Sequence, residues 1–159
     1  MKDDLPVTPA VRALRAAGVA FTPHVYAYEE KGGTAASSRE LGVDEHAVVK
    51  TLVMETDKHE PLLVLMHGDR QVSTKALART LGVKTVAPCA PDMASKHTGY
   101  LVGGTSPFGT RRTMPVYMEA TIAELPRIYI NGGKRGFLVA IAPKDLMRLL
   151  SPTSVSVAV

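Results

Sequence analysis

The chain contains no tryptophan, few other aromatic residues and a single cysteine, Cys89. Because aromatic residues make up only 5% of the 159 residues, the interior must be filled mainly by Val, Leu, Ile, Ala and Met. One cysteine cannot form an internal disulfide, and an unpaired thiol suits a reducing cytosol. These shortages exclude a disulfide-stabilised secreted scaffold and leave an ordinary hydrophobic core.

Long apolar runs are missing as well. No stretch approaches the roughly 18 apolar residues that a membrane span requires, and the opening residues MKDDLP lack the apolar run of a signal peptide. Hydrophobic residues make up 45% of the chain and charged residues 21%, which is ordinary for a soluble protein. Neither repeats nor low-complexity linkers interrupt it. We therefore expect a cytoplasmic protein without a membrane partner, folded as one domain over residues 1–159 with its core over about residues 8–150.

The signatures of several catalytic classes are also absent. The chain has no HExxH, CxxC, GxSxG or Walker-loop sequence. Zinc-dependent hydrolases, serine hydrolases and P-loop enzymes therefore lose support. We expect neither a metal site nor a cofactor.

Positive charge is concentrated in one part of the chain. Residues 96–135 contain six Lys and Arg residues against two Glu residues, so this segment alone accounts for the net charge of +4. A local basic excess suits an anionic partner, because Lys and Arg neutralise phosphates. The alternative is a solvated basic surface without a partner.

Apolar periodicity and breaking residues predict alternating helices and strands. Thr8 and Pro9 open a first helix that Gly18 ends, Pro23 marks an edge strand or bulge, and Asp44 caps a short turn. Pairs of strands that resemble hairpins are mixed with strands separated by helices, which favours an α/β or α+β domain with a mixed sheet over a doubly wound parallel one. Further helices are expected over residues 34–41, 73–81, 91–99 and 143–150. Strands are expected over residues 19–28, 48–54, 62–66, 83–87, 100–102, 116–119, 127–130 and 137–141, with a hairpin at 57–61, a turn at Gly132 and Gly133, and a tail at 151–159.

Lys50 interrupts one of the most apolar predicted strands. Its same-face neighbours Val48, Leu52 and Met54 are apolar, and only Thr51 is polar on the other face. Such a lysine either reaches solvent from an edge strand or is held in a cleft, where its charge binds a phosphate or a developing oxyanion.

Two glycine-rich segments also depart from ordinary patterning. Residues 98–109 read TGYLVGGTSPFG, and residues 129–136 read YINGGKRG. Paired glycines let a ligand approach the backbone closely, and their N–H groups can face an anion or a carbonyl oxygen. Alone, the first fits an ordinary loop and the second a hairpin turn with surface charge. Together with Lys50, they indicate a pocket for a small, partly anionic group.

These features resemble the YbaK/EbsC family of aminoacyl-tRNA deacylases, which is related to the editing domain of some prolyl-tRNA synthetases. The resemblance runs from residue 8 to about residue 150. It rests on HVY at 24–26, LG at 41–42, VKTLV at 49–53 and the two glycine-rich segments, extended to begin at Ile128. It implies a curved, mixed, mostly antiparallel sheet surrounded by helices, and deacylation in translation quality control.

The resemblance is strongest to the branch that acts on cysteine wrongly attached to proline tRNA, and it implies roles for individual residues. Lys50 corresponds to the residue whose loss abolishes activity. The substrate-binding positions are Tyr26, Thr51, Tyr100, Gly103, Gly104, Thr105, Ser106, Asn131 and Gly132. The positions expected to contact tRNA phosphates are Arg111, Arg112, Lys134 and Arg135.

Three departures from the family pattern bear on substrate preference. Asn131 lies where that branch typically has serine, and Leu138 lies where some members carry aspartate. The acidic segment that precedes the second helix in the family is replaced here by KGGT at 31–34.

The resemblance implies that the substrate's own thiol attacks its ester carbonyl and releases a cyclic thiolactone. No histidine or carboxylate adjoins Lys50 in the sequence to act as a base. A free lysine has a pKa of about 10.4, so Lys50 suits charge stabilisation better than proton abstraction. We expect the substrate to be mischarged Cys-tRNA(Pro), or Cys-tRNA(Cys), bound through its 3′-terminal aminoacyl-adenosine, with prolyl-tRNA synthetase as a candidate transient partner.

Two other hypotheses stay open at this point. The same fold would suit a water-dependent hydrolase of alanyl-tRNA or another misacylated tRNA. A non-catalytic module that binds tRNA ends or nucleotides would retain tRNA without turnover.

Overall fold

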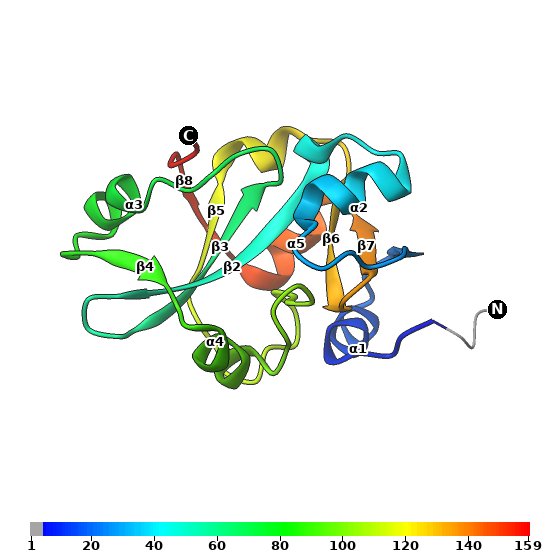
Figure 1. Ribbon diagram of the computed structural model, residues 1–159, viewed down its shortest axis with the longest axis horizontal. Helices are drawn as coiled ribbons and strands as arrows, with labels where there is room; N and C mark the ends of the chain where they lie inside the picture. Colours follow the sequence, from blue (N-terminus) through cyan, green and yellow to red (C-terminus); the bar gives the residue numbers. More distant parts are fainter. Residues whose placement is uncertain (1–4) are drawn as a thin grey trace.

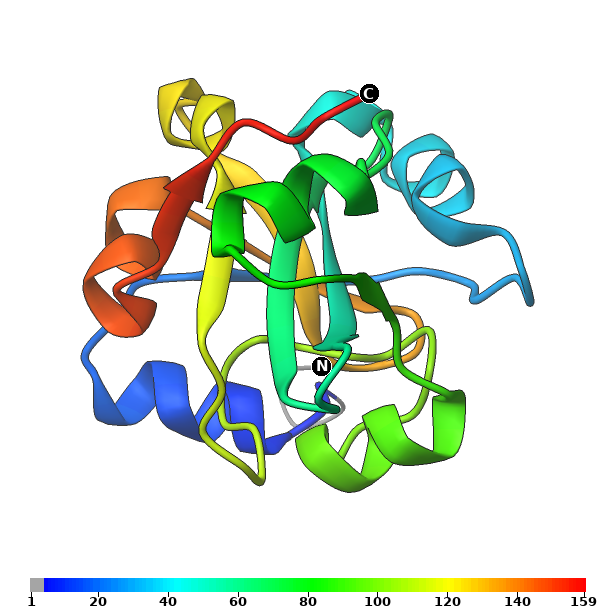
Figure 2. The same ribbon diagram turned by 90° about the vertical axis from the view of Figure 1, so that its left-hand side faces the viewer.

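The computed structural model describes residues 5–159. Residues 1–4, which belong to the segment inspected for a signal peptide, lie outside the described part. Within it, eight strands form one strongly twisted sheet in the order β1-β7-β6-β2-β3-β5-β8, and β4 pairs with β2. Helices cover the sheet from several sides (Figures 1 and 2). The predicted mixed, mostly antiparallel sheet surrounded by helices is confirmed.

The helices form where local capping signals predict them. The Thr8 hydroxyl accepts a hydrogen bond from the amide of Val11 at 3.1 Å at the start of α1, and Ser73 caps α3 in the same way. Glycines in the left-handed conformation end α2, α3 and α4. The five α-helices of the described part are α1 (Pro9–Ala16), α2 (Gly33–Leu41), α3 (Thr74–Leu81), α4 (Pro91–Thr98) and α5 (Pro143–Leu150). Short 3-10 helices, η2 (Glu45–Ala47) and η3 (Ala120–Glu124), precede β2 and follow β5.

The strands of the described part are β1 (Thr22–Val25), β2 (Val48–Thr56), β3 (Pro61–His67), β4 (Val86–Pro88), β5 (Val116–Glu119), β6 (Ile128–Lys134), β7 (Phe137–Ile141) and β8 (Thr153–Val155). β2 and β3 form the predicted hairpin and pair along almost their whole length. Antiparallel pairs also join β1 to β7, β6 to β7 and β4 to β2. The pairs β2–β6, β3–β5 and β5–β8 are parallel.

One edge of β2 is paired only at its two ends, and this open edge positions the site. One edge of β2 pairs with β3, so β6 and β4 share the other edge. β6 pairs with Val48 and Val49, whereas β4 pairs with Met54 to Thr56. Between these pairings, residues 50–52 have no strand partner on that edge among residues 5–159. The sheet therefore opens at the strand that carries Lys50.

Two hydrophobic clusters support this sheet. One includes Leu14 of α1, Leu65 of β3 and Phe108, and the other packs Val64 against Leu77 of α3. These side chains are at most 2% exposed, and burying each stabilises the fold by about 1.5–3 kcal/mol. The two clusters fix β2 and β3 on both faces, which gives the open edge a rigid support.

Five expectations about secondary structure are corrected. Residues 100–102 do not form a strand: they turn, and the Leu101 carbonyl accepts from the Gly104 amide at 2.8 Å. The predicted turn at Gly132 and Gly133 is instead a bulged part of β6. The strand expected over 19–28 is confined to β1, and the one expected over 83–87 is confined to β4. The expected tail carries β8, because its apolar residues complete the second cluster.

Candidate functional site

A cavity of about 610 Å³ lies at the open edge of β2. The strand contributes Val48 to Val53, including Lys50, and helices α2 and α4 contribute residues on either side (Figure 1). The segment between β1 and α2 and the glycine-rich loop at 102–105 complete the walls. The cavity thus combines segments from most of the length of the chain. Its size is in the range of pockets that bind small-molecule ligands.

Lys50 lies in this cavity and is half-buried. Its Nζ donates a hydrogen bond to the main-chain carbonyl of Arg70. Burial lowers the pKa of the Lys50 ammonium below its ordinary value, while the charges of Glu45 and Asp69 raise it part of the way back. Neither carboxylate lines the cavity. The Lys50 ammonium therefore lies beside an apolar strand edge.

Thr51 adds a polar group that has no partner. Its Oγ1 is buried and makes no hydrogen bond within residues 5–159. A buried hydroxyl normally has a hydrogen-bond partner, so this one is an exception among the buried polar groups of the fold.

The structure brings six of the expected substrate and phosphate positions to the cavity wall, besides Lys50. These are Tyr26, Thr51, Gly103, Thr105, Asn131 and Arg135. They come from four separate segments. The three stretches that the sequence analysis singled out therefore meet in space.

Four expected substrate positions do not line the cavity. The Tyr100 hydroxyl donates to the Phe108 carbonyl at 2.6 Å within the core, where burial raises the pKa of this phenol to about 12. Ser106 is fully buried and accepts from the Phe108 amide at 3.2 Å. These two residues hold the loop at 98–109 through hydrogen bonds to Phe108, and they do not line the cavity.

The other two are Gly104 and Gly132, which have no room for a side chain. A Cβ at Gly104 would lie 2.7 Å from the amide nitrogen of Arg135, and one at Gly132 would meet the Phe137 ring. These glycines are needed where the loop, β6 and β7 pack closely.

Of the four expected phosphate contacts, only Arg135 lines the cavity. Its Nε donates to the Val102 carbonyl at 2.8 Å, and its guanidinium lies 5.4 Å from the centre of the Tyr28 ring. Arg111 lies next to Gly99 at the end of α4. Arg111, Arg112 and Lys134 lie outside the cavity wall.

Cys89 lies in the cavity wall, although it falls outside the three stretches of sequence that indicated a pocket. Its amide donates to the Val53 carbonyl at 3.0 Å, so the residue continues the β4 pairing at the open edge. Burial, with the hydrogen bond and charge of Glu55, raises the pKa of its thiol to about 11. Tyr28, Glu29, Glu30, Lys31 and Ser37 also line the cavity and were not expected there. No local pattern marks these positions, because loop direction decides which side chains face inward.

The described residues also bear on metal binding and on membrane-spanning helices. No group of three or more His, Cys, Asp or Glu residues within 5–159 is arranged to hold a metal ion. No helix in this part is long and apolar enough to cross a membrane.

Comparison with known proteins identifies this architecture. The model of the aminoacyl-tRNA editing domain matches residues 29–149, well over half of the chain. The chain belongs to the aminoacyl-tRNA editing domain family. Its substrate class is therefore aminoacyl-tRNA, and its role is the deacylation of wrongly charged tRNA.

Individual relatives agree with this assignment. The chain is 29% identical over 143 residues to the Enterococcus faecalis protein named "Putative Cys-tRNA(Pro)/Cys-tRNA(Cys) deacylase EbsC", covering 89% of this chain and 87% of that protein. It is 36% identical over 67 residues to a proline–tRNA ligase of Syntrophotalea carbinolica, covering 42% of this chain and 12% of the ligase. A crystal structure described as "a putative trans-editing enzyme for prolyl tRNA synthetase" has the same fold, with a TM-score of 0.82 and 21% identity over 96% of this chain and 98% of that one.

Proposed function

We propose that this protein removes cysteine from mischarged Cys-tRNA(Pro), or from Cys-tRNA(Cys), by using the thiol of the substrate as the nucleophile. The main support is the position of the half-buried Lys50 ammonium in the cavity. The name of the Enterococcus faecalis relative supports the choice of cysteine.

In the proposed reaction, the substrate sulfur forms a bond to the carbonyl carbon of its own ester. The bond from that carbon to the tRNA 3′ or 2′ oxygen breaks, the tRNA oxygen takes up a proton, and a cyclic thiolactone leaves. The thiol loses its proton to solvent before it attacks. No water molecule adds to the carbonyl in this step, so the reaction is an intramolecular acyl substitution that leaves a ring, of the lyase type and not a hydrolysis.

The chain contributes charge and orientation to this step. The Lys50 ammonium stabilises the negative charge that develops on the carbonyl oxygen. Tyr26 and the Gly103 backbone, which line the cavity, hold the aminoacyl-adenosine so that the sulfur and the carbonyl carbon meet. Asn131 and Arg135 also line the cavity, where the Arg135 guanidinium is the expected phosphate contact.

Glu45, Asp69 and Cys89 are poorly suited to act as base or nucleophile. Glu45 accepts from the Thr34 hydroxyl at 2.8 Å, and Asp69 pairs with His46 at 2.8 Å. The pKa of about 11 keeps the Cys89 thiol protonated at neutral pH, because burial and Glu55 disfavour its thiolate. A substrate thiol with a free pKa of about 8.5 is a few per cent thiolate at pH 7 and is strongly nucleophilic.

The deciding experiment compares cysteinyl-, seryl- and alanyl-tRNA as substrates. Serine differs from cysteine by one atom, and binding alone discriminates such pairs by only about 1–3 kcal/mol. We expect rapid clearance of cysteinyl-tRNA and almost none of seryl-tRNA. Equal clearance of seryl- or alanyl-tRNA would support a water-using hydrolase instead, and retention of tRNA without turnover would support a binding module.

We also propose that prolyl-tRNA synthetase forms a transient complex with this protein. The support is the description of the similar crystal structure as a trans-editing enzyme for that synthetase, together with the similarity to a proline–tRNA ligase. The same panel should be repeated with the synthetase present. Faster clearance of Cys-tRNA(Pro), with no change for Cys-tRNA(Cys), is expected. Equal rates with and without synthetase would contradict the complex.

A further inference from the structure

A tight turn over residues 67–70 lies directly beside Lys50. The Arg70 amide donates to the His67 carbonyl at 3.1 Å, which closes the turn. The Arg70 carbonyl then accepts the hydrogen bond from Lys50 Nζ. The position of the ammonium therefore depends on the conformation of this turn.

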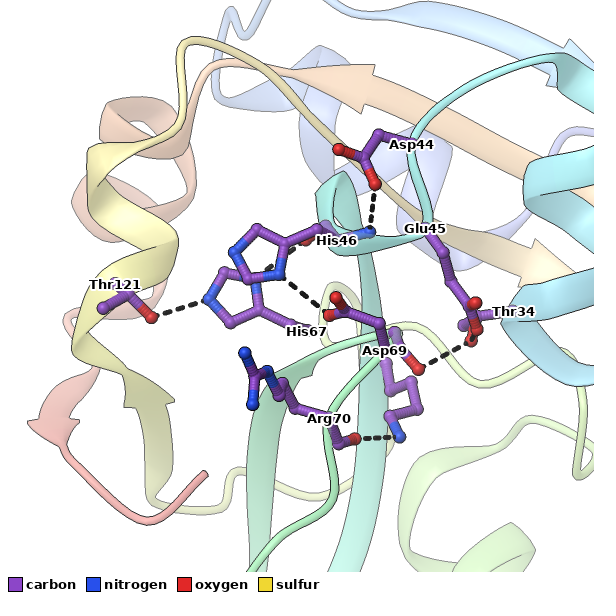
Figure 3. Close-up of polar contacts among 10 residues, drawn as sticks. Thr34, Asp44, Glu45, His46, His67, Asp69, Arg70 and Thr121 are labelled. Atoms are coloured by element: carbon purple, nitrogen blue, oxygen red, sulfur yellow. Dashed lines mark hydrogen bonds and ion pairs between the residues drawn. The ribbon is translucent and has the colours of Figure 1, made fainter. Parts of the chain in front are cut away.

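Gly68 anchors the turn to the elements around it. Its amide donates to the Val48 carbonyl at 2.6 Å, and its carbonyl accepts from the Thr34 hydroxyl at 3.1 Å. A Cβ at this position would lie 2.7 Å from the Glu45 carbonyl and 2.8 Å from the Val48 carbonyl. Only glycine fits, and the backbone of the turn is held between β2, η2 and α2 (Figure 3).

Two histidines hold the turn from its other side (Figure 3). The rings of His46 and His67 stack with centroids 3.7 Å apart and planes 7° apart. His67 Nδ1 donates to the His46 carbonyl at 2.8 Å, because a carbonyl can only accept. Its Nε2 is 2.7 Å from the Thr121 hydroxyl. His67 is 1% exposed and fully bonded, so it forms a fixed platform for His46.

Asp69 connects this platform to Lys50. Its Oδ1 is 2.8 Å from His46 Nδ1. Burial opposes the ionisation of Asp69, but the hydrogen bond and charge of His46 overcome that effect and lower the pKa of the carboxyl. The resulting negative charge acts on Lys50 together with that of Glu45. Asp69 thus acts on the Lys50 ammonium in two ways. The backbone of its turn sets the position of the ammonium, and its charge favours the protonated form.

We propose that Asp69, oriented by His46, is a positioning residue for Lys50: it fixes the Arg70 carbonyl against the ammonium and supplies a counter-charge behind it. This inference rests on the proposed function only for its kinetic consequences. Asp69 does not touch the substrate, because it lies outside the cavity wall. The titratable groups that share the cavity with Lys50 are Tyr26, Tyr28, Glu29, Glu30, Lys31, Cys89 and Arg135.

The direct test is the titration of Lys50 by NMR of the lysine side chains, with the Lys50 signal identified by its absence in Lys50→Ala. In Asp69→Asn, we expect the Lys50 pKa to fall, because the charge that favours the ammonium is gone. We also expect kcat to fall by about tenfold to a hundredfold with KM nearly unchanged. The alkaline limb of the pH–kcat profile should move to lower pH.

Asp57→Asn is the matched control. The Asp57 carboxylate accepts from the amides of Lys84 and Thr85 at 3.0 and 3.3 Å, so it also fixes a loop, but one outside the cavity wall. This variant should leave the Lys50 pKa and the alkaline limb of the pH–kcat profile unchanged even where it lowers the melting temperature.

A second pair of variants tests the role of His46 without changing Asp69. His46→Asn retains an N–H donor near the position of Nδ1, whereas His46→Ala does not. Activity in His46→Asn should exceed that in His46→Ala.

The outcomes separate this inference from the proposed function. If Asp69→Asn leaves the Lys50 pKa unchanged and lowers kcat no more than Asp57→Asn does, Asp69 has only a structural role and the inference is wrong. If His46→Asn is no better than His46→Ala, the orienting role of His46 is wrong. If the Lys50 pKa falls in Asp69→Asn while the unmodified protein clears no cysteinyl-tRNA, the proposed function fails and the positioning role stands.

Discussion

The side-chain amide of Asn131 on β6 donates a hydrogen bond to the carbonyl of Gly103 at 3.2 Å. Its carbonyl oxygen accepts from the amides of Gly133 and Lys134 at 2.7 and 3.1 Å. One side chain therefore shapes the bulge of β6 and ties the glycine-rich loop to it. Arg135 adds a second tie through its bond to Val102. The cavity wall at 102–105 is held by the β6–β7 hairpin.

Replacing Asn131 by alanine should loosen this wall. We expect faster hydrogen exchange over residues 101–105 and a higher KM, because each neutral hydrogen bond that is removed contributes about 1 kcal/mol. Asn131→Ser should retain part of the bonding to the bulge without the hydrogen bond to Gly103. Thr80→Ala, which removes a hydroxyl bonded to the Ala76 carbonyl in α3, serves as the control. Unaltered exchange in the loop of Asn131→Ala would contradict the tie.

Removing the cation of Lys50 should abolish deacylation while the fold persists. Lys50→Ala takes away the charge next to the reacting carbonyl but little core packing, because the side chain is only half-buried. Lys50→Arg should also be poor, since the guanidinium is larger and forked. Circular dichroism and turnover of cysteinyl-tRNA should be measured on the same samples. Near-normal turnover in Lys50→Ala would remove this residue from the mechanism.

Activity should depend on pH in a bell-shaped manner. At low pH the rate rises as the substrate thiol, with a free pKa of about 8.5, becomes a thiolate. At high pH it falls as Lys50 loses its proton, and burial brings this loss below the ordinary lysine pKa. The reaction needs the charged lysine, so the rate is retained below the pKa of Lys50 and disappears above it. A profile of kcat/KM that keeps rising through the ordinary range of lysine would exclude a catalytic ammonium.

Replacing Cys89 by serine should leave most activity intact, although this residue lines the cavity. Burial and Glu55 raise the pKa of its thiol to about 11, so thiolate is scarce at neutral pH. Alkylation of the native protein by iodoacetamide should accordingly be slow at pH 7 and accelerate only in strongly alkaline solution. Loss of activity in Cys89→Ser together with rapid alkylation at pH 7 would make Cys89 a candidate nucleophile.

Reversing the charges of Arg111 and Arg112 should weaken tRNA binding and flatten its salt dependence. Removing one ionic interaction with a phosphate reduces the slope of log K against log salt by about one. Lys134→Glu tests the cation that precedes Arg135 at the end of β6 in the same way. Arg12→Glu on α1, outside the basic segment, is the control and should change the slope least. Identical slopes in all of these variants and in the unmodified protein would mean that the basic segment is only a solvated surface.

The local elements and the unusual residues could be predicted from the amino-acid sequence. Thr8 and Ser73 begin helices because their hydroxyls satisfy free amides, and Gly42, Gly82 and Gly99 end helices because they adopt the left-handed conformation. These signals act within a few residues, so they can be read without knowing the fold. Lys50 was recognisable in the same way, as a cation in an apolar strand.

The location of the cavity and the side chains that face it depend on the tertiary structure. The open edge of β2 exists because β6 and β4 pair with opposite ends of that strand, although residues 86–88 and 128–134 lie far from it in sequence. No local propensity encodes such a gap, since it depends on where distant strands stop. For the same reason Cys89 reaches the cavity while Tyr100 turns into the core, where Phe108 offers its carbonyl. The turn behind Lys50 also depends on distant contacts, because His46, His67 and Thr121 meet only after β2, β3 and η3 have packed together.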